Sequence, residues 1–530
     1  MSSKTDLRGL RARVLAIAAL IVMFKIWLAA VFPMTGDEAY FIFWGEHPAR
    51  GYYDHPPMVG WLLAPIVALT REVWALRLPA VLAPALMAWM LYAALRRSGE
   101  ERALLAALAL LLVPLHVWNI FITTDTPLVL ASLACALCYW KGIEQGLQRH
   151  GEVPSAMSHL STAGGAGWFA AAGVFLGIAF LSKYFSALLA LALLGHCVLS
   201  RKGGRPWGAL AITYIVSAPF GLVNLAWNHE HCWANLMFNV YNRHGDAGLS
   251  WRTPLLFAVT VLYLLSVPAL VQMARGAVAG RLRDPGVRYF ALMCFLPLGA
   301  FALLSSVKLI GLHWLWSFVP LFFALAARAL DAAQLRVSVK FLGILSLLHV
   351  VAILAASAMP LQAWRPAKIY DGVVFHARIT TVLEQMREAA GGRALLAADG
   401  YSAATTLGFF AGSNVAVFGA GSSHARHDDL VTDFRDWEGR DAVILRRRLP
   451  SQGSAAEEYA PFFREVESRS FRIEGVDFHL VIGRGFRYLP YRDAVLVPIR
   501  DRWYRIPAYL PQGGCVFCDR YFGSYCPARS

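Results

Sequence analysis

The sequence predicts a polytopic α-helical membrane protein that ends in a small soluble α/β domain. Of its 530 residues, 57% are hydrophobic and 16% are charged, whereas globular proteins average about 25% charged residues. The hydrophobic residues fall in successive runs close to the ~20 residues that a bilayer-spanning helix needs. From about residue 371 the composition changes to that of a water-soluble chain. We therefore expect a transmembrane domain over 1–360 and a soluble domain over 361–530.

Eleven apolar runs are predicted to cross the membrane. The first apolar run follows a basic N-terminus, as in a signal peptide. It is long enough to span the membrane, however, and lacks the small residues of a cleavage site, so we expect it to be retained as a helix. The predicted spans are 12–32, 76–95, 103–119, 125–140, 167–181, 184–200, 208–227, 253–273, 289–305, 314–330 and 341–359.

Lys and Arg cluster in alternate connections between these runs, beginning with the N-terminal segment. The positive-inside rule assigns those connections to the cytoplasm. The net charge of +15 then reflects membrane topology, and no nucleic-acid partner is expected. The remaining connections, including a first loop at 33–75, lie on the outer side with the C-terminal domain. For a bacterial inner-membrane protein that side is the periplasm.

The soluble part has short strand patterns in "RALLAADG", "NVAVFG", "DAVILRR" and "SFRIEGVDFHLVIGRGF". Helical patterns near 373–390 and 428–437 accompany them, which predicts an α/β domain. "VAVFGAGSS" follows a strand as a dinucleotide-binding turn does. His424 replaces the third glycine of that fingerprint, so we exclude dinucleotide binding.

Eight cysteines divide into two groups. Four lie in apolar runs and are expected to be buried: Cys135, Cys138, Cys197 and Cys294. The other four lie in outer segments, namely Cys232, Cys515, Cys518 and Cys526. Three tail thiols in "CVFCDRYFGSYC" could bind zinc, but an oxidising compartment favours a disulfide within the tail. We hypothesise that the remaining tail thiol pairs with Cys232.

The first outer loop, "TGDEAYFIFWGEHPARGYYDHPPMVGWLLAP", contains two acidic clusters. Asp37 follows the first span at the boundary between lipid and water, where a carboxylate costs free energy unless it is paired or used. The adjacent Glu38 diverges from it by about a quarter turn on a helix. Asp37 is therefore a functional candidate, although it could equally be a helix N-cap.

Three further polar groups lie at the outer ends of spans. Asp54 and His55 precede two prolines, which hold the preceding backbone extended and present both side chains rigidly. Asp125 in "FITTDTPLVL" is either a functional residue or a residue in the first turn of a helix. Pro127 supports the second alternative, because proline suits a helix's first turn. Lys183 in "LSKYF" has no hydrophilic loop around it and needs an anion or a carboxylate. Bases and cations on one membrane face suit transfer of a group from a lipid phosphate.

Four motifs over about 30–330 carry a family resemblance: "GDEAYF…GYYDHPPMVGWL", "TTDTPLVL", "LSKYFSALL" and "GLHWLWSFVPLFF". The chain resembles bacterial GT-C membrane glycosyltransferases related to protein O-mannosyltransferases and to the lipid A aminoarabinose transferase. The resemblance implies a GT-C fold and a polyprenyl-phosphate donor of a hexose or pentose. It also implies inversion at the anomeric carbon and a periplasmic acceptor such as lipid A, lipopolysaccharide or another glycan, with no required cofactor.

The resemblance also implies roles for individual residues. Asp37 and Asp125 match the family's two catalytic acidic positions, and Lys183 matches its phosphate-binding lysine. Asp54 and His55 are expected at the donor phosphate, although His55 stands where the aminoarabinose transferase has a lysine, and histidine is a weaker, pH-dependent phosphate partner. The residues expected to line the substrate cavity are Glu38, Tyr53, Tyr184, His313 and Trp314.

Some relatives bind an ion near the phosphate. Here a divalent metal could be held by Asp54 with His229, His231 or His244, but histidines in a polar loop can equally be solvated. Two other functions stay open. One is protein O-glycosylation by the same superfamily, and the other is transport or flipping of a lipid-linked sugar. Transporters carry ionisable groups near the bilayer midplane on broken, repeated helices, whereas these lie at span ends and show no internal repeat.

Overall fold

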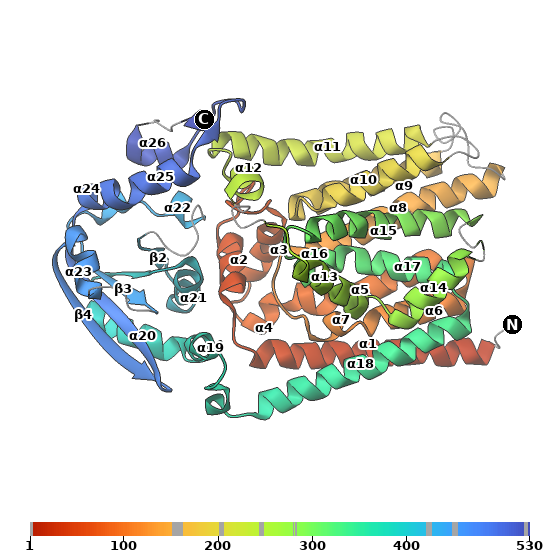
Figure 1. Ribbon diagram of the computed structural model, residues 1–530, viewed down its shortest axis with the longest axis horizontal. Helices are drawn as coiled ribbons and strands as arrows, with labels where there is room; N and C mark the ends of the chain where they lie inside the picture. The colour runs from red at the N-terminus through yellow and green to blue at the C-terminus, as the bar shows by residue number, and fades with distance from the viewer. Residues whose placement is uncertain are drawn as a thin grey trace. The chain divides into compact units, whose positions relative to one another are not determined.

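A computed structural model describes residues 4–150, 163–200, 206–242, 248–278, 280, 283–419, 427–447, 454–523 and 528–529 (Figure 1). The chain divides into two compact units. The first, called here the helical unit, comprises 1–31, 70–223 and 246–356. The second, called here the sheet unit, comprises 32–69, 224–245 and 357–530. The sheet unit thus combines the first loop and the segment 224–245 with the C-terminal part of the chain.

The helical unit contains α1, α4–α10, most of α11, and α13–α18 (Figure 1). Their bounds are α1 Lys4–Val31, α4 Val73–Leu76, α5 Leu78–Leu95, α6 Glu100–Leu111, α7 Pro114–Trp118, α8 Asp125–His150, α9 Ala163–Ser182, α10 Ser186–Leu199, α11 Trp207–Glu230, α13 Arg252–Leu264, α14 Val267–Val278, α15 Pro285–Ser305, α16 Leu312–Leu315, α17 Val319–Ala329 and α18 Ala332–Ala358.

Within the described residues, eight helical segments are long and apolar enough to cross a membrane, and each matches one of the eleven predicted spans. A ninth, predicted at 253–273, is bent by 93° between α13 and α14. The last two, 103–119 and 184–200, form shorter helices. The first of these breaks before Pro114, which has no N–H and begins a new helix at a favoured position. The chain is a multi-pass membrane protein.

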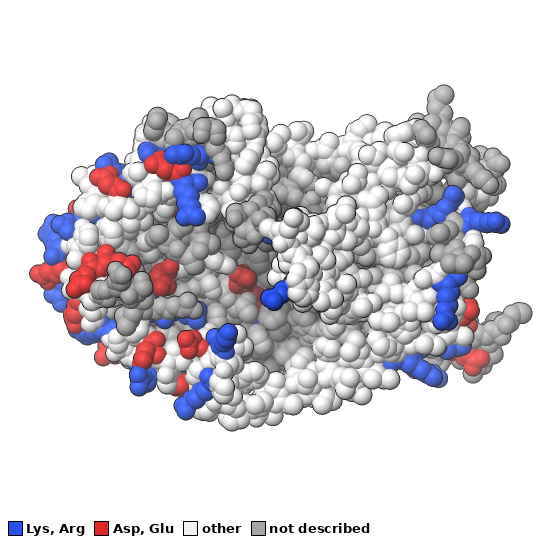
Figure 2. All heavy atoms as spheres, in the orientation of Figure 1, with Lys and Arg blue, Asp and Glu red and all other residues white. Residues whose placement is uncertain are grey.

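Burial separates the inner helices of this unit from the outer ones. Every residue of Ala103–Leu111 in α6 and of Val319–Ala327 in α17 is buried. In contrast, only 11% of the apolar window of α18 is buried, as expected of a lipid-facing helix. Figure 2 shows a largely uncharged surface over the helices, with Lys and Arg gathered at one end. Within this unit, Arg11 forms an ion pair with Glu100.

The sheet unit combines the two loop segments with the C-terminal domain. Its helices are α2 Gly36–Glu46, α3 Met58–Val67, α12 Ala234–Met237, α19 Tyr370–Ala377, α20 Ile379–Ala390, α21 Tyr401–Ala411, α22 Asp428–Val431, α23 Ala455–Tyr459, α24 Tyr488–Tyr491, α25 Val497–Trp503 and α26 Val516–Phe522, with a π-helix at Phe238–Asn242. Its strands are β1 Leu395–Ala398, β2 Ala416–Val417, β3 Ala442–Arg446, β4 Phe463–Ile473, β5 Val476–Phe486, β6 Ile506–Pro507 and β7 Ala528–Arg529.

Five strands form one sheet in the order β2-β1-β3-β5-β4. The first three are parallel, and β5 runs antiparallel to both β3 and β4. The turn between β4 and β5 uses Glu474 and Gly475, both with positive φ, as tight hairpins require. The predicted small α/β domain is confirmed, with α19 and α20 at the helical pattern near 373–390. His424 lies outside the described residues.

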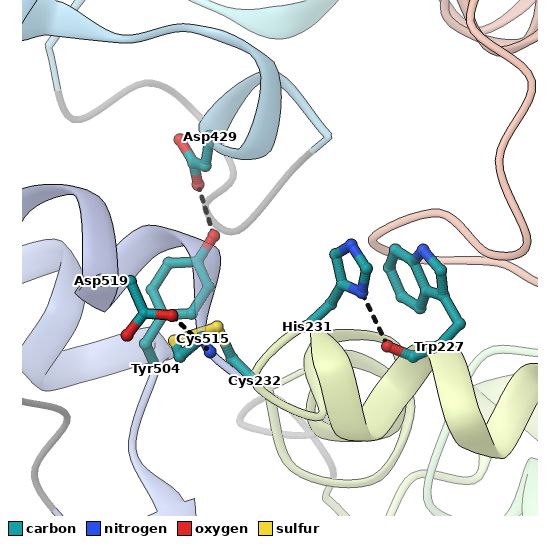
Figure 3. Close-up of a disulfide and its surroundings, with 7 residues drawn as sticks. All are labelled: Trp227, His231, Cys232, Asp429, Tyr504, Cys515 and Asp519. Carbon is teal, nitrogen blue, oxygen red and sulfur yellow. Dashed lines mark hydrogen bonds between the residues drawn. A yellow bond between two sulfur atoms is a disulfide. The ribbon is translucent and has the colours of Figure 1, made fainter. Parts of the chain in front are cut away.

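A disulfide joins Cys232 to Cys515, 283 residues later (Figure 3). This is the hypothesised pairing of Cys232 with a tail cysteine. Beside it, the Cys232 amide donates to the Gly514 carbonyl at 2.8 Å. A Cβ added at Gly513 would collide with the carbonyl oxygen of His229, so the tail packs closely only because glycine stands there. Cys518 is also disulfide-bonded, and Cys526 lies outside the described residues.

The four cysteines of the apolar runs are free thiols. Cys135, Cys197 and Cys294 are buried, as predicted, and Cys138 is half-buried.

Replacing Cys232 by Ser is expected to lower the free energy of unfolding by about 2–5 kcal/mol, because a crosslink over a long loop restricts the unfolded chain. Thermal melting of the purified protein with and without reductant measures this. Reductant should lower the melting temperature of the wild type and of Cys138→Ser by more than that of Cys232→Ser, in which only the disulfide of Cys518 remains to be reduced. A Cys232→Ser protein that melts at the wild-type temperature would contradict the expectation.

Candidate functional site

Helix α2 begins with a capping box formed by Thr35 and Glu38. The Glu38 amide donates to Thr35 Oγ1 at 3.3 Å, and the Thr35 amide donates to Glu38 Oε2 at 3.0 Å. Together they satisfy the first backbone donors of the helix. The N-cap alternative for Asp37 is therefore wrong, because Thr35 has that role. Glu38 is buried and belongs to the cap, whereas we expected it in the substrate cavity.

Asp37 is exposed and points its carboxylate at the C-terminal domain. Tyr401 Oη donates a hydrogen bond of 2.8 Å to Asp37 Oδ1. Tyr401 is the first residue of α21 and follows β1 directly, at the carboxyl edge of the parallel strands. Open α/β sheets bind ligands at this edge. No local sequence pattern identifies Tyr401 as a site residue, and it lies 364 residues after Asp37.

The "YYDHPP" segment forms the rigid turn that its prolines predict. The Tyr52 amide donates to the His55 carbonyl at 3.1 Å. Two asparagine amides from the segment 224–245 fix the turn from outside. Asn235 donates to the Tyr52 carbonyl and Asn239 to the Asp54 carbonyl, both at 3.0 Å. The turn therefore presents Asp54 and His55 from a backbone that is hydrogen-bonded on both sides.

Alternate side chains of this turn have different surroundings. Asp54 Oδ1 accepts a hydrogen bond of 3.2 Å from Tyr40 Oη. The half-buried His55 ring lies 6.2 Å from the Trp44 ring. Tyr53, in contrast, is fully buried in the core of the sheet unit, with its ring 5.8 Å from that of Phe238. Tyr53 therefore packs the core and does not line a substrate cavity as expected.

Tyr40 connects the two acidic clusters. Its hydroxyl donates to Asp54 and accepts a hydrogen bond of 2.9 Å from the His427 amide. Its ring lies 5.3 Å from the ring of Tyr401, which in turn binds Asp37. Burial, reinforced by the Asp54 charge, raises the pKa of Tyr40 well above its usual value, so the hydroxyl remains a donor. Asp37 and Asp54 thus belong to one hydrogen-bonded aromatic cluster.

His427 is buried beside this cluster, with its ring 5.0 Å from the Tyr52 ring. Burial, together with the neighbouring His47 and His231, lowers the pKa of His427 to about 3. The imidazole is therefore neutral at neutral pH. With His47, Trp227 and His231 it lines a cavity of about 310 Å³.

The predicted metal ligands have other contacts. His231 places Nδ1 2.8 Å from the Trp227 carbonyl oxygen (Figure 3), and Asp54 accepts from Tyr40. His229 is near Trp233, with ring centroids 6.0 Å apart. Over the part of the chain that the structure describes, no three His, Cys, Asp or Glu side chains are placed to hold a metal ion. His244 lies outside those residues, so the metal site stays a prediction.

In the helical unit, Lys183 and Asp125 form a buried ion pair. Lys183 Nζ lies 2.9 Å from Oδ1 and 3.1 Å from Oδ2 of Asp125, and the two side chains are 8% and 3% exposed. The expectation that Lys183 needs a carboxylate is confirmed. Asp125 is also the first residue of α8, so the first-turn alternative is confirmed, and its functional role stays a prediction.

Aromatic residues surround this ion pair on one side. Lys183 Nζ lies 5.1 Å from the centre of the Phe185 ring, and Phe185 lies 4.8 Å from the buried Trp314. The half-buried Tyr184 packs against Phe180 at 5.3 Å, and His313 is exposed. The structure therefore groups Trp314 with Lys183 through Phe185.

The sequence pattern of one family, described as dolichyl-phosphate-mannose-protein mannosyltransferase, matches residues 54–151. No curated protein sequence matches the chain. Among solved structures, ArnT from Cupriavidus metallidurans in the apo state has a TM-score of 0.60 at 17% identity, covering 89% of this chain and 98% of ArnT. The chain therefore has the fold of ArnT. ArnT bound to undecaprenyl phosphate gives a TM-score of 0.59 at 16% identity, with the same coverage.

These comparisons confirm the resemblance to the GT-C superfamily. The matched segment 54–151 contains Asp54, His55 and Asp125, whereas Asp37 and Lys183 lie outside it. The family match and the fold together indicate a glycosyltransferase.

Removing one partner of the Lys183–Asp125 pair is expected to destabilise the protein by about 3–5 kcal/mol, because an uncompensated charge stays buried. Lys183→Met and Asp125→Asn should each unfold at lower denaturant, and the double variant should recover much of the loss. Arg472→Met, which breaks an exposed pair with Asp477, is the control and should cost under about 1 kcal/mol. Additive losses in the double variant would contradict the pairing.

His427 is expected to make the protein less stable in acid. The usual pKa of histidine is about 6.5, and the pKa of His427 in the folded protein is about 3. Between these two pH values, His427 is protonated in the unfolded chain and neutral in the folded chain. Stability therefore falls as pH falls through this range, by up to about 1.4 kcal/mol per pH unit.

His427→Phe should remove that part of the pH dependence in denaturant titrations from pH 7 to pH 4, while the exposed His229→Gln keeps it. An unchanged slope in His427→Phe would show that His427 does not resist protonation.

Proposed function

We propose that this protein is an inverting glycosyltransferase that moves a sugar from a polyprenyl-phosphate donor to a glycolipid or glycan acceptor such as lipid A or lipopolysaccharide. One observation carries the proposal: the chain shares its fold with ArnT over nearly the whole of both proteins, and ArnT has been observed with undecaprenyl phosphate. The positions of the polar residues at helix ends agree better with transfer than with the mid-bilayer sites of transporters.

Asp37 is the proposed base for the acceptor. It is exposed and takes no part in capping α2, so one carboxylate oxygen can receive the acceptor's hydroxyl proton while the other binds Tyr401. As the proton moves to Asp37, the acceptor oxygen forms a bond to the anomeric carbon of the sugar. The bond from that carbon to the donor phosphate oxygen breaks with its electron pair, and polyprenyl phosphate leaves. Attack opposite the leaving group inverts the anomeric carbon.

Lys183 is the proposed cation for the donor phosphate. Its ammonium group has three N–H donors and lies 2.9 Å and 3.1 Å from the two carboxylate oxygens of Asp125. Asp125 fixes the position of the ammonium group before the substrate binds, so less reorganisation is needed as charge accumulates on the leaving phosphate. Asp54 and His55, held by the hydrogen-bonded turn, are proposed to assist at the phosphate.

The sheet unit is proposed to lie in the bacterial periplasm and the N-terminus in the cytoplasm. The Cys232–Cys515 disulfide supports this, because disulfides persist in oxidising compartments and are rare in the cytosol. The basic residues of the N-terminal segment and of alternate connections support it independently. The protein would then span the inner membrane and receive its donor from the lipid phase.

A second acceptor class is favoured by one specific observation. The family that matches residues 54–151 is described as a protein mannosyltransferase. Transfer to a protein hydroxyl needs the same base and the same phosphate cation, so this alternative changes the acceptor and not the chemistry. Mass spectrometry of lipid A, lipopolysaccharide and glycoproteins from cells with and without the gene separates the two acceptors.

No metal is proposed to be required for transfer, because proton transfer to Asp37 and charge stabilisation by Lys183 account for both ends of the reaction. A divalent ion near the donor phosphate, bound by Asp54 and the loop histidines, is the alternative. Turnover measured with a chelator, and then with added divalent ions, decides between them.

Asp37→Asn is expected to reduce sugar transfer from a purified polyprenyl-phosphate donor by about 10²- to 10⁴-fold, the usual contribution of a positioned base. Asn keeps the size of the side chain but cannot accept the proton. The exposed Asp436→Asn is the matched control and should retain wild-type turnover. Near wild-type transfer by Asp37→Asn would remove Asp37 from the base role.

A further inference from the structure

We infer that Tyr401 of the C-terminal domain is a positioning residue that orients the Asp37 carboxylate for the proposed reaction. The inference rests on the proposed function and assigns part of the active site to a domain 364 residues further along the chain. Its direct observation is the 2.8 Å hydrogen bond from Tyr401 Oη to Asp37 Oδ1.

The backbone around this hydrogen bond is closely packed. A Cβ added at Gly36 would lie only 2.9 Å from the Cα of Ser402, so the first turns of α2 and α21 touch where one has no side chain. Thr405 Oγ1 on α21 also lies 3.4 Å from the Gly36 carbonyl oxygen. Asp37 directly follows Gly36, and Tyr401 directly precedes Ser402. Both residues of the hydrogen bond therefore lie next to the close contact between the two helices. Their separation is therefore set by helix packing and not by two mobile side chains.

The Tyr401 ring is held in addition by its neighbour. It lies 5.3 Å from the ring of Tyr40 at an interplanar angle of 58°. Tyr40 is itself fixed at its hydroxyl by Asp54 and by the His427 amide. Tyr401 lies three residues after the end of β1, and His427 lies ten residues after the end of the neighbouring parallel strand β2, so the cluster takes groups from the chain beyond both strands.

The chemistry of the bond suits positioning. Burial, together with the charge of Asp37, raises the pKa of Tyr401, so its hydroxyl stays protonated and can only donate to the carboxylate. Donation to Oδ1 fixes the plane of the carboxylate and leaves Oδ2 for the acceptor hydroxyl. A capping role for Asp37 is already excluded by Thr35 and Glu38, and the hydrogen bond lies at an exposed position. The hydrogen bond from Tyr401 therefore contributes little to the stability of the protein, and its main effect is to orient the Asp37 carboxylate.

The test compares Tyr401→Phe with the wild type in the full-length protein, using a purified polyprenyl-phosphate sugar donor and a saturating range of acceptor. Loss of a hydrogen bond to a charged group is expected to lower kcat about 10- to 100-fold, with a smaller change in acceptor KM. The melting temperature should stay that of the wild type.

Matched variants separate positioning from packing. The exposed Tyr509→Phe should behave as wild type. Thr405→Val, which alters the same helix contact without touching Tyr401 Oη, should keep the wild-type kcat at saturating acceptor. The double variant Asp37→Asn/Tyr401→Phe should be no slower than Asp37→Asn alone, because both changes remove one function.

Three results would overturn the inference. If Tyr401→Phe keeps the wild-type kcat while Asp37→Asn is inactive, the proposed function stands and Tyr401 has no positioning role. If Tyr401→Phe is slower only in proportion to a lowered melting temperature, Tyr401 is structural. If Asp37→Asn turns over normally, the base role and the inference fail together.

Discussion

The capping box of Thr35 and Glu38 fixes where α2 begins, and so determines what Asp37 can do. If Asp37 capped the helix, its carboxylate would be hydrogen-bonded to amides of its own chain. Because Thr35 and Glu38 satisfy those amides, Asp37 sits one residue inside the helix with its carboxylate directed outward. Gly36, next to it, has no side chain and admits α21 at contact distance. These adjacent residues together bring a carboxylate and a tyrosine from distant parts of the chain into one hydrogen bond.

Much of the fold was predictable from the sequence because membrane spans are defined by length and hydrophobicity. The two predicted spans that shortened show the limit of that signal. Residues 103–119 are apolar apart from His116 and Asn119, but Pro114 divides them into two helices. Residues 184–200 lose their first turn beside Lys183 and begin at Ser186. Hydrophobicity thus predicts that a segment avoids water, whereas backbone hydrogen bonding decides whether it forms one long helix.

The candidate site was predictable only in part, for a similar reason. Lys183 needed a carboxylate, and the structure pairs it with Asp125, because an isolated charge at that burial is costly. Tyr53 looked like a site residue beside Asp54, yet neighbouring residues of an extended segment point in opposite directions, and Tyr53 entered the core. Tyr401 carried no signal, since a tyrosine at the start of a soluble helix is ordinary until its partner is known. Contacts between distant segments decide such cases.

The sheet unit is built from three separated segments of the chain, so it cannot assemble until the last of them has been synthesised. Its first segment is synthesised before most of the membrane helices, its second near the middle, and its last, which carries the sheet and Cys515, at the end. At a synthesis rate of about 5–20 residues per second, Cys232 waits roughly 15–60 s for a partner 283 residues later. Throughout that time the loop bearing Asp37 has neither Tyr401 nor the rest of its core. A partly translated chain therefore has its membrane helices before it has the hydrogen bond that holds Asp37.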